Sequence, residues 1–139
     1  MSEGKPGYVT TAPDPRSTQE ILDASAREQM VLALDELQGM VGIWNDEMFG
    51  TERQLPLAAH LRREAEELHE SIRDAIEFGS LAAVGHMADE CADMMHLLCA
   101  IAHQSGFSLA EATLKKFAVN QGRQWKAPDQ DGCIEHEKS

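Results

Sequence analysis

The chain has 139 residues, a mass of 15.3 kDa and a formal net charge of −12. This length fits one ordinary domain, and the negative charge disfavours a protein that coats nucleic acid or anionic lipid, because both are themselves negatively charged. Its apolar content of 42% argues against a wholly disordered chain, and no apolar run approaches the roughly 18 residues needed to cross a bilayer. We therefore expect a soluble globular protein with no nucleic-acid and no membrane partner.

The two ends of the chain and its cysteines indicate where the protein works. Residues 1–16 lack the charged and then apolar organisation of a secretory signal, and their Gly, Pro and Thr content predicts a flexible N-terminal arm. Cys91, Cys99 and Cys133 cannot all pair within one chain, and none belongs to a CxxC pair. Free thiols in a reducing cytoplasm are the interpretation that fits best.

Apolar residues recur at helical spacing in the first half of the chain. A capping box of Ser17 and Glu20 predicts the start of a helix over roughly residues 18–46. Gly50 and the Gln-Leu-Pro that follows break the pattern, which resumes at Leu57 and predicts a second helix that runs to about Gly79.

The same periodicity continues in the second half. It predicts a third helix from Leu81 to Gly106, whose glycine is well placed to terminate it, and a fourth helix from a second capping box, Ser108 with Glu111, to about Arg123. No alternating β-branched run separates these stretches, so we expect an all-α fold, a bundle of four to five helices. The predicted domain covers residues 17–125, and residues 126–139 have the composition of a C-terminal surface tail.

Two carboxylates of the second predicted helix lie where apolar residues are expected. Because each helical residue advances about 100°, Glu64 falls inside the apolar arc of its helix and Glu67 at the edge of that arc. On the third predicted helix, Glu90 lies within the apolar arc and Asp93 at its edge. The same geometry thus occurs twice, with 22 residues between the two pairs.

Four carboxylates on a packing face would cost several kcal/mol each to desolvate, and they would repel one another unless cations bound among them. Carboxylate-rich sites suit Mg²⁺ or Mn²⁺, which keep some of their waters and bind phosphate oxygens. The alternative is that both pairs are ordinary solvated helix surface in an acidic chain. Their recurrence on two neighbouring inner faces favours a metal site.

A rival interpretation is a different metal site. Glu66 with His69, and Asp93 with His96, have the acid-x-x-His spacing of di-iron helical bundles. Helical phase puts Glu66 and His69 on the charged face, away from Glu64, which disfavours that interpretation. His60 lies on the Glu64 side of its helix, either as a neighbour of the metal ligands or as a histidine of the core or rim.

Lys116, Asn120 and Arg123 share one face of the fourth predicted helix. An amide flanked by two cations suits phosphate oxygens, although a solvated basic stripe near a helix C-terminus is the simpler explanation.

Trp44 and Phe49 bracket the end of the first predicted helix. Packing in the core is their ordinary role, and lining a pocket for a purine base is the alternative.

Taken in order, these segments resemble the MazG-like all-α nucleoside triphosphate pyrophosphohydrolases, whose signature is ExxE followed by ExxD. Across roughly residues 30–136 the resemblance is closer to the dATP/dGTP diphosphohydrolase branch, which includes the MazZ-type phage enzymes. It rests on segments spelled WNDEMFG, HLRREAEEL, ADECADMMHLL, KKFAVNQGRQW and PDQDG, and on His136.

The resemblance implies hydrolysis of a purine nucleoside triphosphate, (d)GTP or dATP, to its monophosphate and diphosphate, in the cytosol of a bacterium or a phage-infected host. It implies about two to three Mg²⁺ or Mn²⁺ ions per site, bound by Glu64, Glu67, Glu90 and Asp93, with Glu64 or Glu67 as the catalytic base. Phosphate binding then maps onto Lys116, Asn120 and Arg123. In MazZ-type enzymes the product feeds the synthesis of modified phage DNA.

The resemblance also implies a homo-oligomer, a tetramer or at least a dimer, with sites near the subunit interfaces. A single chain of this size with four helices would leave a half-open carboxylate face that a second copy could complete. Two other classes of function remain: a di-iron carboxylate bundle, and a non-enzymatic helical protein whose acidic faces bind partners.

Overall fold

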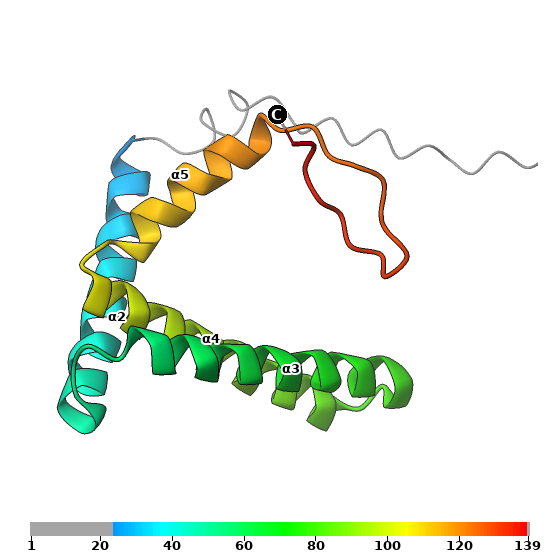
Figure 1. The fold of residues 1–139 in the computed structure, drawn as a ribbon, viewed down its shortest axis with the longest axis horizontal. Helices are drawn as coiled ribbons and strands as arrows, with labels where there is room; N and C mark the ends of the chain where they lie inside the picture. The colour runs from blue at the N-terminus through cyan, green and yellow to red at the C-terminus, as the bar shows by residue number, and fades with distance from the viewer. Residues whose placement is uncertain (1–23, 139) are drawn as a thin grey trace, which may run out of the picture. The chain divides into compact units, whose positions relative to one another are not determined.

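A computed structural model describes residues 24–138, and within them the fold is all-α, as predicted (Figure 1). Its helices are α2 (Ala24–Phe49), α3 (Gln54–Phe78), α4 (Leu81–Ser105) and α5 (Leu109–Gln121). The expected N-terminal arm, and the expected capping box of Ser17 and Glu20, lie outside the described residues. None of the described helices is long and apolar enough to span a membrane.

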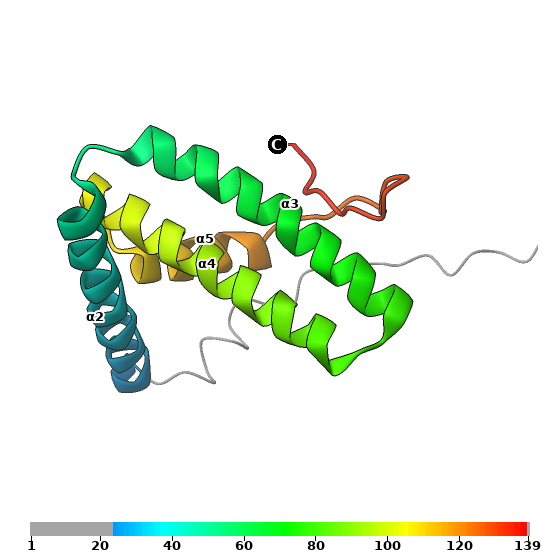
Figure 2. The ribbon, with the colours of Figure 1, turned by 90° about the horizontal axis from the view of Figure 1, so that it is seen from below.

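The helices α3 and α4 form an antiparallel hairpin, and they run side by side in both views (Figures 1 and 2). Gly79 ends α3 in the left-handed conformation, with φ of 60°, which glycine adopts without a steric penalty. The next residue, Ser80, caps α4, because its Oγ accepts a hydrogen bond from the backbone N–H of Ala83 at 3.1 Å. The tight turn fixes the register in which the two helices face each other.

The start of α3 differs from the sequence prediction. The helix begins at Gln54, so Pro56 lies inside its first turn and does not precede it. Proline is tolerated there because the first N–H groups of a helix have no intrahelical partner, and its fixed φ suits helical geometry. At the other end of the preceding loop, α2 continues to Phe49, a few residues beyond the predicted end.

Polar contacts fasten the C-terminal half of α2 to the end of α4. His103 Nε2 lies 3.1 Å from Asp46 Oδ2, and Gln104 Nε2 donates a hydrogen bond to Asp46 Oδ1 at 2.7 Å. Gly42 allows this approach, since a Cβ at that position would collide with the side chain of His103. Residues 29–112 form one compact unit, in which α2 lies where α3 begins and α4 ends (Figure 2).

Ser108 caps α5 as predicted, because its Oγ accepts a hydrogen bond from the N–H of Glu111 at 3.1 Å. The same hydroxyl donates to Asp35 Oδ1 on α2 at 2.6 Å, and Gln38 Oε1 accepts from the N–H of Leu109 at 2.8 Å. The first residues of α5 are thereby tied to α2 within the unit of residues 29–112.

Residues from Thr113 onward belong to a second compact unit. Its C-terminal segment turns back on itself: Lys126 N donates to Glu135 O at 2.8 Å, and Glu137 N donates to Gln124 O at 2.9 Å. At the tip, Asp129 Oδ1 accepts from two backbone N–H groups, those of Asp131 and Cys133. The segment predicted as a surface tail is therefore a hydrogen-bonded loop over most of its length.

The core of the first unit is small. Its buried apolar residues centre on Leu57, Leu97 and Ala100 where α3 and α4 meet, with Leu61 and Ile101 packed against them. Toward the α3–α4 turn, the periodic apolar positions are uncovered: Ile76 is 81% exposed and Leu81 is 91% exposed. Part of the apolar face from which α3 and α4 were predicted therefore stays exposed in the single chain.

Candidate functional site

Three carboxylates predicted as metal ligands meet between α3 and α4. Oxygen atoms of Glu64, Glu90 and Asp93 all lie within 4.8 Å of one another. Glu90 and Asp93 are one helical turn apart and so project from the same side of α4, while Glu64 approaches from the facing helix. The antiparallel hairpin therefore brings together residues that are far apart in the sequence.

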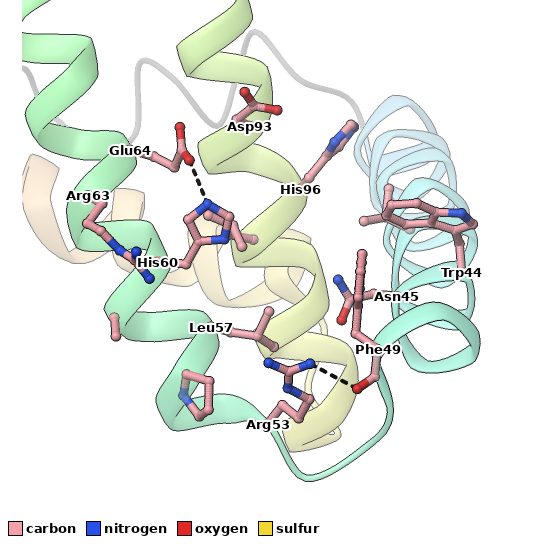
Figure 3. Close-up of a pocket in the computed structure, with 14 residues that line it drawn as sticks. Trp44, Asn45, Phe49, Arg53, Leu57, His60, Arg63, Glu64, Asp93 and His96 are labelled. Carbon is pink, nitrogen blue, oxygen red and sulfur yellow. Dashed lines mark hydrogen bonds and ion pairs between the residues drawn. The ribbon is translucent and has the colours of Figure 1, made fainter.

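Glu64 lies among apolar neighbours, as its helical phase predicts. The residue is only 9% exposed, and Leu57 and Leu97 nearby belong to the small core. One turn earlier on α3, His60 Nε2 lies 2.7 Å from Glu64 Oε1 (Figure 3). A buried carboxylate needs a hydrogen-bond partner or a cation, and within the described residues His60 is the partner of this oxygen. His60 thus holds the Glu64 side chain in place.

The surroundings of Glu90 favour its protonated form. Partial burial of the carboxylate raises the pKa of Glu90, a side-chain hydrogen bond with Glu64 raises it further, and so do the charges of Glu67, Glu64 and Asp93. A cation bound beside Glu90 would offset this repulsion and favour the charged carboxylate form. Carboxylate oxygens are ligands of the kind that Mg²⁺ and Mn²⁺ take, so Glu64, Glu90 and Asp93 are the residues here that could hold such an ion.

Glu67, the fourth predicted ligand, lies outside this cluster of three. Its side chain is exposed on α3, one turn beyond Glu64, and its charge acts on Glu90 from there. The structure thus groups three of the four predicted acidic residues within coordination range and leaves Glu67 at the edge, where its helical phase put it.

A pocket of about 550 Å³ adjoins the acidic cluster (Figure 3). Its volume lies within the usual range for small-molecule sites. Glu64 and Asp93 line it together with apolar and aromatic residues and several basic ones: Val41, Trp44, Asn45, Phe49, Arg53, Pro56, Leu57, Ala59, His60, Arg63, His96 and Leu97. All of these residues belong to the unit of residues 29–112.

The two aromatic residues predicted as a base-binding pair both line this pocket. The rings of Trp44 and Phe49 meet edge to face, with centroids 5.6 Å apart and planes at 90°. Each residue is 51% exposed, so neither is a core side chain. Aromatic surface from α2 and the carboxylates Glu64 of α3 and Asp93 of α4 thus lie around one cavity.

Sequence reasoning missed several polar residues of the pocket. Arg53 Nη1 donates to the backbone oxygen of Phe49 at 2.9 Å, which places this guanidinium at the end of α2. Arg63 also lines the cavity, and so does the amide of Asn45. The position of Arg63 beside the site could have been predicted from the sequence, because it lies three residues after His60 and therefore shares part of the same helix face.

The basic residues predicted to bind phosphate lie on α5 and just after it, in the second unit. Arg123 Nη1 donates to Asn120 Oδ1 at 2.9 Å, and both residues are half-buried. Lys116 is exposed, one turn before Asn120. The structure therefore joins the amide and the guanidinium directly, and it leaves the lysine ammonium in solvent.

The residues of the di-iron alternative do not converge on one centre. Glu66 and His69 are exposed on α3, on the charged side where their phase predicted them, and neither belongs to the acidic cluster. Asp93 and His96, the second pair, both line the pocket on α4.

Comparison of the chain with protein-family models, with curated proteins and with solved structures finds no match.

Proposed function

We propose that the protein is a metal-dependent purine nucleoside triphosphate pyrophosphohydrolase of the MazG-like type. Its substrate is a purine nucleoside triphosphate, (d)GTP or dATP, which it hydrolyses to the nucleoside monophosphate and diphosphate. The observation that carries the proposal is the meeting of Glu64, Glu90 and Asp93, with oxygen atoms within 4.8 Å of one another, since Glu64 and Asp93 of this cluster also line a pocket of about 550 Å³.

The three clustered carboxylates hold Mg²⁺ or Mn²⁺, with Glu67 positioned to join from the edge. Ions held there would supply Lewis-acid activation of a water and would neutralise charge on the phosphates, the main requirements of phosphoryl transfer. Glu64 or Glu67 accepts the proton of the attacking water. The contact from His60 keeps Glu64 directed toward the cluster, so the ligand is oriented before the ion binds.

The remainder of the pocket suits a nucleotide. Trp44 and Phe49 offer aromatic surface on which a flat base can lie, and Arg53 and Arg63 offer positive charge for phosphate oxygens. A purely structural acidic cluster would need neither feature beside it. The phosphate-binding role of Lys116, Asn120 and Arg123 rests on their spacing in the sequence and on the resemblance, and it stays a prediction.

Self-association is part of the proposal, as a homotetramer or at least a dimer. Large apolar side chains at the α3–α4 turn, Ile76, Phe78 and Leu81, stand in solvent in the single chain. Contiguous exposed apolar surface of this kind commonly marks a contact with another protein, and a second copy would cover it. Light scattering should give at least twice the 15.3 kDa mass of one chain, and a monomeric protein would contradict this part.

The deciding experiment incubates the pure protein with each of the four dNTPs and four NTPs in Mg²⁺ and resolves the products. The proposal predicts monophosphate and diphosphate, formed fastest from purine substrates. The matched variants are Glu90→Gln, which removes a clustered carboxylate, and Glu66→Gln, which makes the same change on the solvated face of α3. Nucleoside diphosphate with orthophosphate, or no turnover by the wild type, would overturn the proposal.

The same assay and the metal content of the pure protein separate the remaining classes of function. A helical protein that only binds partners would show no turnover in either variant or in the wild type. A di-iron protein would purify with iron and absorb in the near ultraviolet, and it would have no use for Mg²⁺.

A further inference from the structure

One polar side chain in the pocket lacks a partner. Asn45 is only 8% exposed, and its Oδ1 is the buried side-chain oxygen that accepts no hydrogen bond from any of the described residues. Leaving a buried acceptor unpaired costs on the order of 1 to 3 kcal/mol. A side chain that tolerates this cost in the wall of a cavity is positioned for a donor that arrives with a ligand.

The position of Asn45 indicates what kind of donor that is. Asn45 follows Trp44 in the sequence and lies one turn before Phe49, and both aromatic residues line the same pocket as its amide. Figure 3 shows the amide directed from α2 into the pocket beside Phe49, away from the end where Glu64 and Asp93 lie. Phosphate and carboxylate groups offer only acceptors at neutral pH and cannot satisfy Oδ1, whereas an N–H on a flat heterocycle can.

We propose that Asn45 reads the hydrogen-bonding edge of a nucleobase that lies against Trp44 and Phe49 in this pocket. Its Oδ1 accepts an N–H of the base, and its Nδ2 donates to the acceptor beside that N–H. The edge that is read is the one opposite the sugar, because the phosphates extend toward the acidic cluster. This inference deepens the proposed function and rests on it for the orientation of the nucleotide.

An amide presents one acceptor and one donor, whereas a carboxylate presents acceptors alone. The isosteric change Asn45→Asp therefore alters which bases fit. Guanine has two neighbouring donors on this edge, N1–H and the exocyclic amine, and can satisfy a carboxylate. Adenine has a donor next to an acceptor and cannot. Since a bidentate contact discriminates between bases by about 1 to 3 kcal/mol, the ratio of guanosine to adenosine affinity should rise about 5- to 150-fold.

The experiment uses nucleosides, which lack phosphate and need neither metal nor hydrolysis. The full chain is labelled with ¹⁵N and titrated with guanosine, adenosine, cytidine and uridine, and the side-chain amide signal of Asn45 is identified by its loss in Asn45→Asp. In the wild type this signal should shift on titration. In the variant the ranking of the nucleosides should move toward guanosine. Gln38→Glu, the same change on α2 at an amide already paired with Phe107 and Leu109, should leave the ranking unaltered.

A second arm does not depend on the variant folding. Guanosine is compared with 1-methylguanosine, and adenosine with N6,N6-dimethyladenosine, on the wild-type chain. Blocking the donor should weaken binding about tenfold or more and remove the shift of the Asn45 signal. An Asn45 signal that does not respond to any nucleoside, or a uniform loss across all four in Asn45→Asp, would overturn the inference. Nucleoside binding with the predicted ranking but no triphosphate hydrolysis would count against the proposed function only.

Discussion

His60 Nε2 and Glu64 Oε1 lie 2.7 Å apart, one turn from each other on α3, at the boundary between the small core and the pocket. His60 is about half exposed, while the Glu64 side chain is nearly buried, so the contact orients a carboxylate that solvent hardly reaches. From this position Glu64 faces Glu90 and Asp93 on α4. The contact with His60 thus fixes the orientation of Glu64, which is one of the proposed metal ligands.

Removing the imidazole should loosen metal binding without dismantling the helices. Partners that hold a metal ligand in place commonly contribute about 10- to 100-fold to metal affinity, and we expect a loss of that size in His60→Ala. His69→Ala is the matched control, because His69 is an exposed histidine on the same helix, outside the pocket. Mn²⁺ titration followed by electron paramagnetic resonance measures both. Equal affinities in the two variants would contradict the role of His60.

Glu90→Gln should abolish turnover while leaving helicity intact. Glutamine is similar in shape to glutamate but carries no charge for a cation, so we expect activity to fall by at least about a hundredfold. Circular dichroism checks that the helices remain. Glu66→Gln should retain nearly full activity, and a similar loss in both variants would show that general acidity of the surface, and not the cluster, is what matters.

Trp44→Ala should weaken substrate binding more than it slows the chemical step. Stacking of a base on an aromatic side chain contributes about 1 to 3 kcal/mol, which corresponds to a rise in KM of roughly 5- to 150-fold. Ile43→Ala removes a similarly exposed apolar side chain of α2 that does not line the pocket. Steady-state kinetics of the two variants test this, and an unchanged KM in Trp44→Ala would exclude stacking on this ring.

The raised pKa of Glu90 predicts how stability depends on pH in the absence of metal. Above the ordinary glutamate pKa and up to the raised one, the folded chain binds more protons than the unfolded chain. The free energy of unfolding contributed by Glu90 is therefore present at lower pH and is lost as the pH rises through that window. Urea unfolding in a chelating buffer should show this slope, and Glu90→Gln should lack it. A slope that persists in the variant would assign the effect to other groups.

The three thiols should differ in reactivity. Cys91 and Cys133 are exposed, whereas Cys99 is buried and its desolvation raises the pKa of the thiol. Mass spectrometry after alkylation near neutral pH should find Cys91 and Cys133 modified and Cys99 protected until the chain unfolds. Rapid modification of Cys99 in the native protein would contradict the packing of α4.

The parts of the fold that follow from helical periodicity were predictable. Glu64 stands out in the sequence because its phase puts a carboxylate among leucines, and its low exposure confirms that inference. Ser108 with Glu111 spells a capping box, and the Ser108 hydroxyl caps α5 as expected. Both rest on local geometry, where spacing along the chain determines position in space.

Features that depend on contacts between helices could not be predicted in the same way. Asn45 is an ordinary polar residue in a helix until the structure shows its oxygen buried without a partner. Pro56 marked a break in the pattern, but only the structure distinguishes a proline before a helix from one in its first turn. Ile76 belongs to the apolar stripe of α3, yet periodicity does not say whether this chain or a second copy covers it.

The most direct test of the central claim is a calorimetric titration of the metal-free protein with Mn²⁺, beside the variant Glu64→Gln. If Glu64, Glu90 and Asp93 form a metal centre, the wild type should take up the ion with a saturating heat at defined stoichiometry, and the variant should lose most of that affinity. A wild type that gives no saturating signal, or a variant that binds as well as the wild type, would contradict the metal centre and the hydrolase proposed from it.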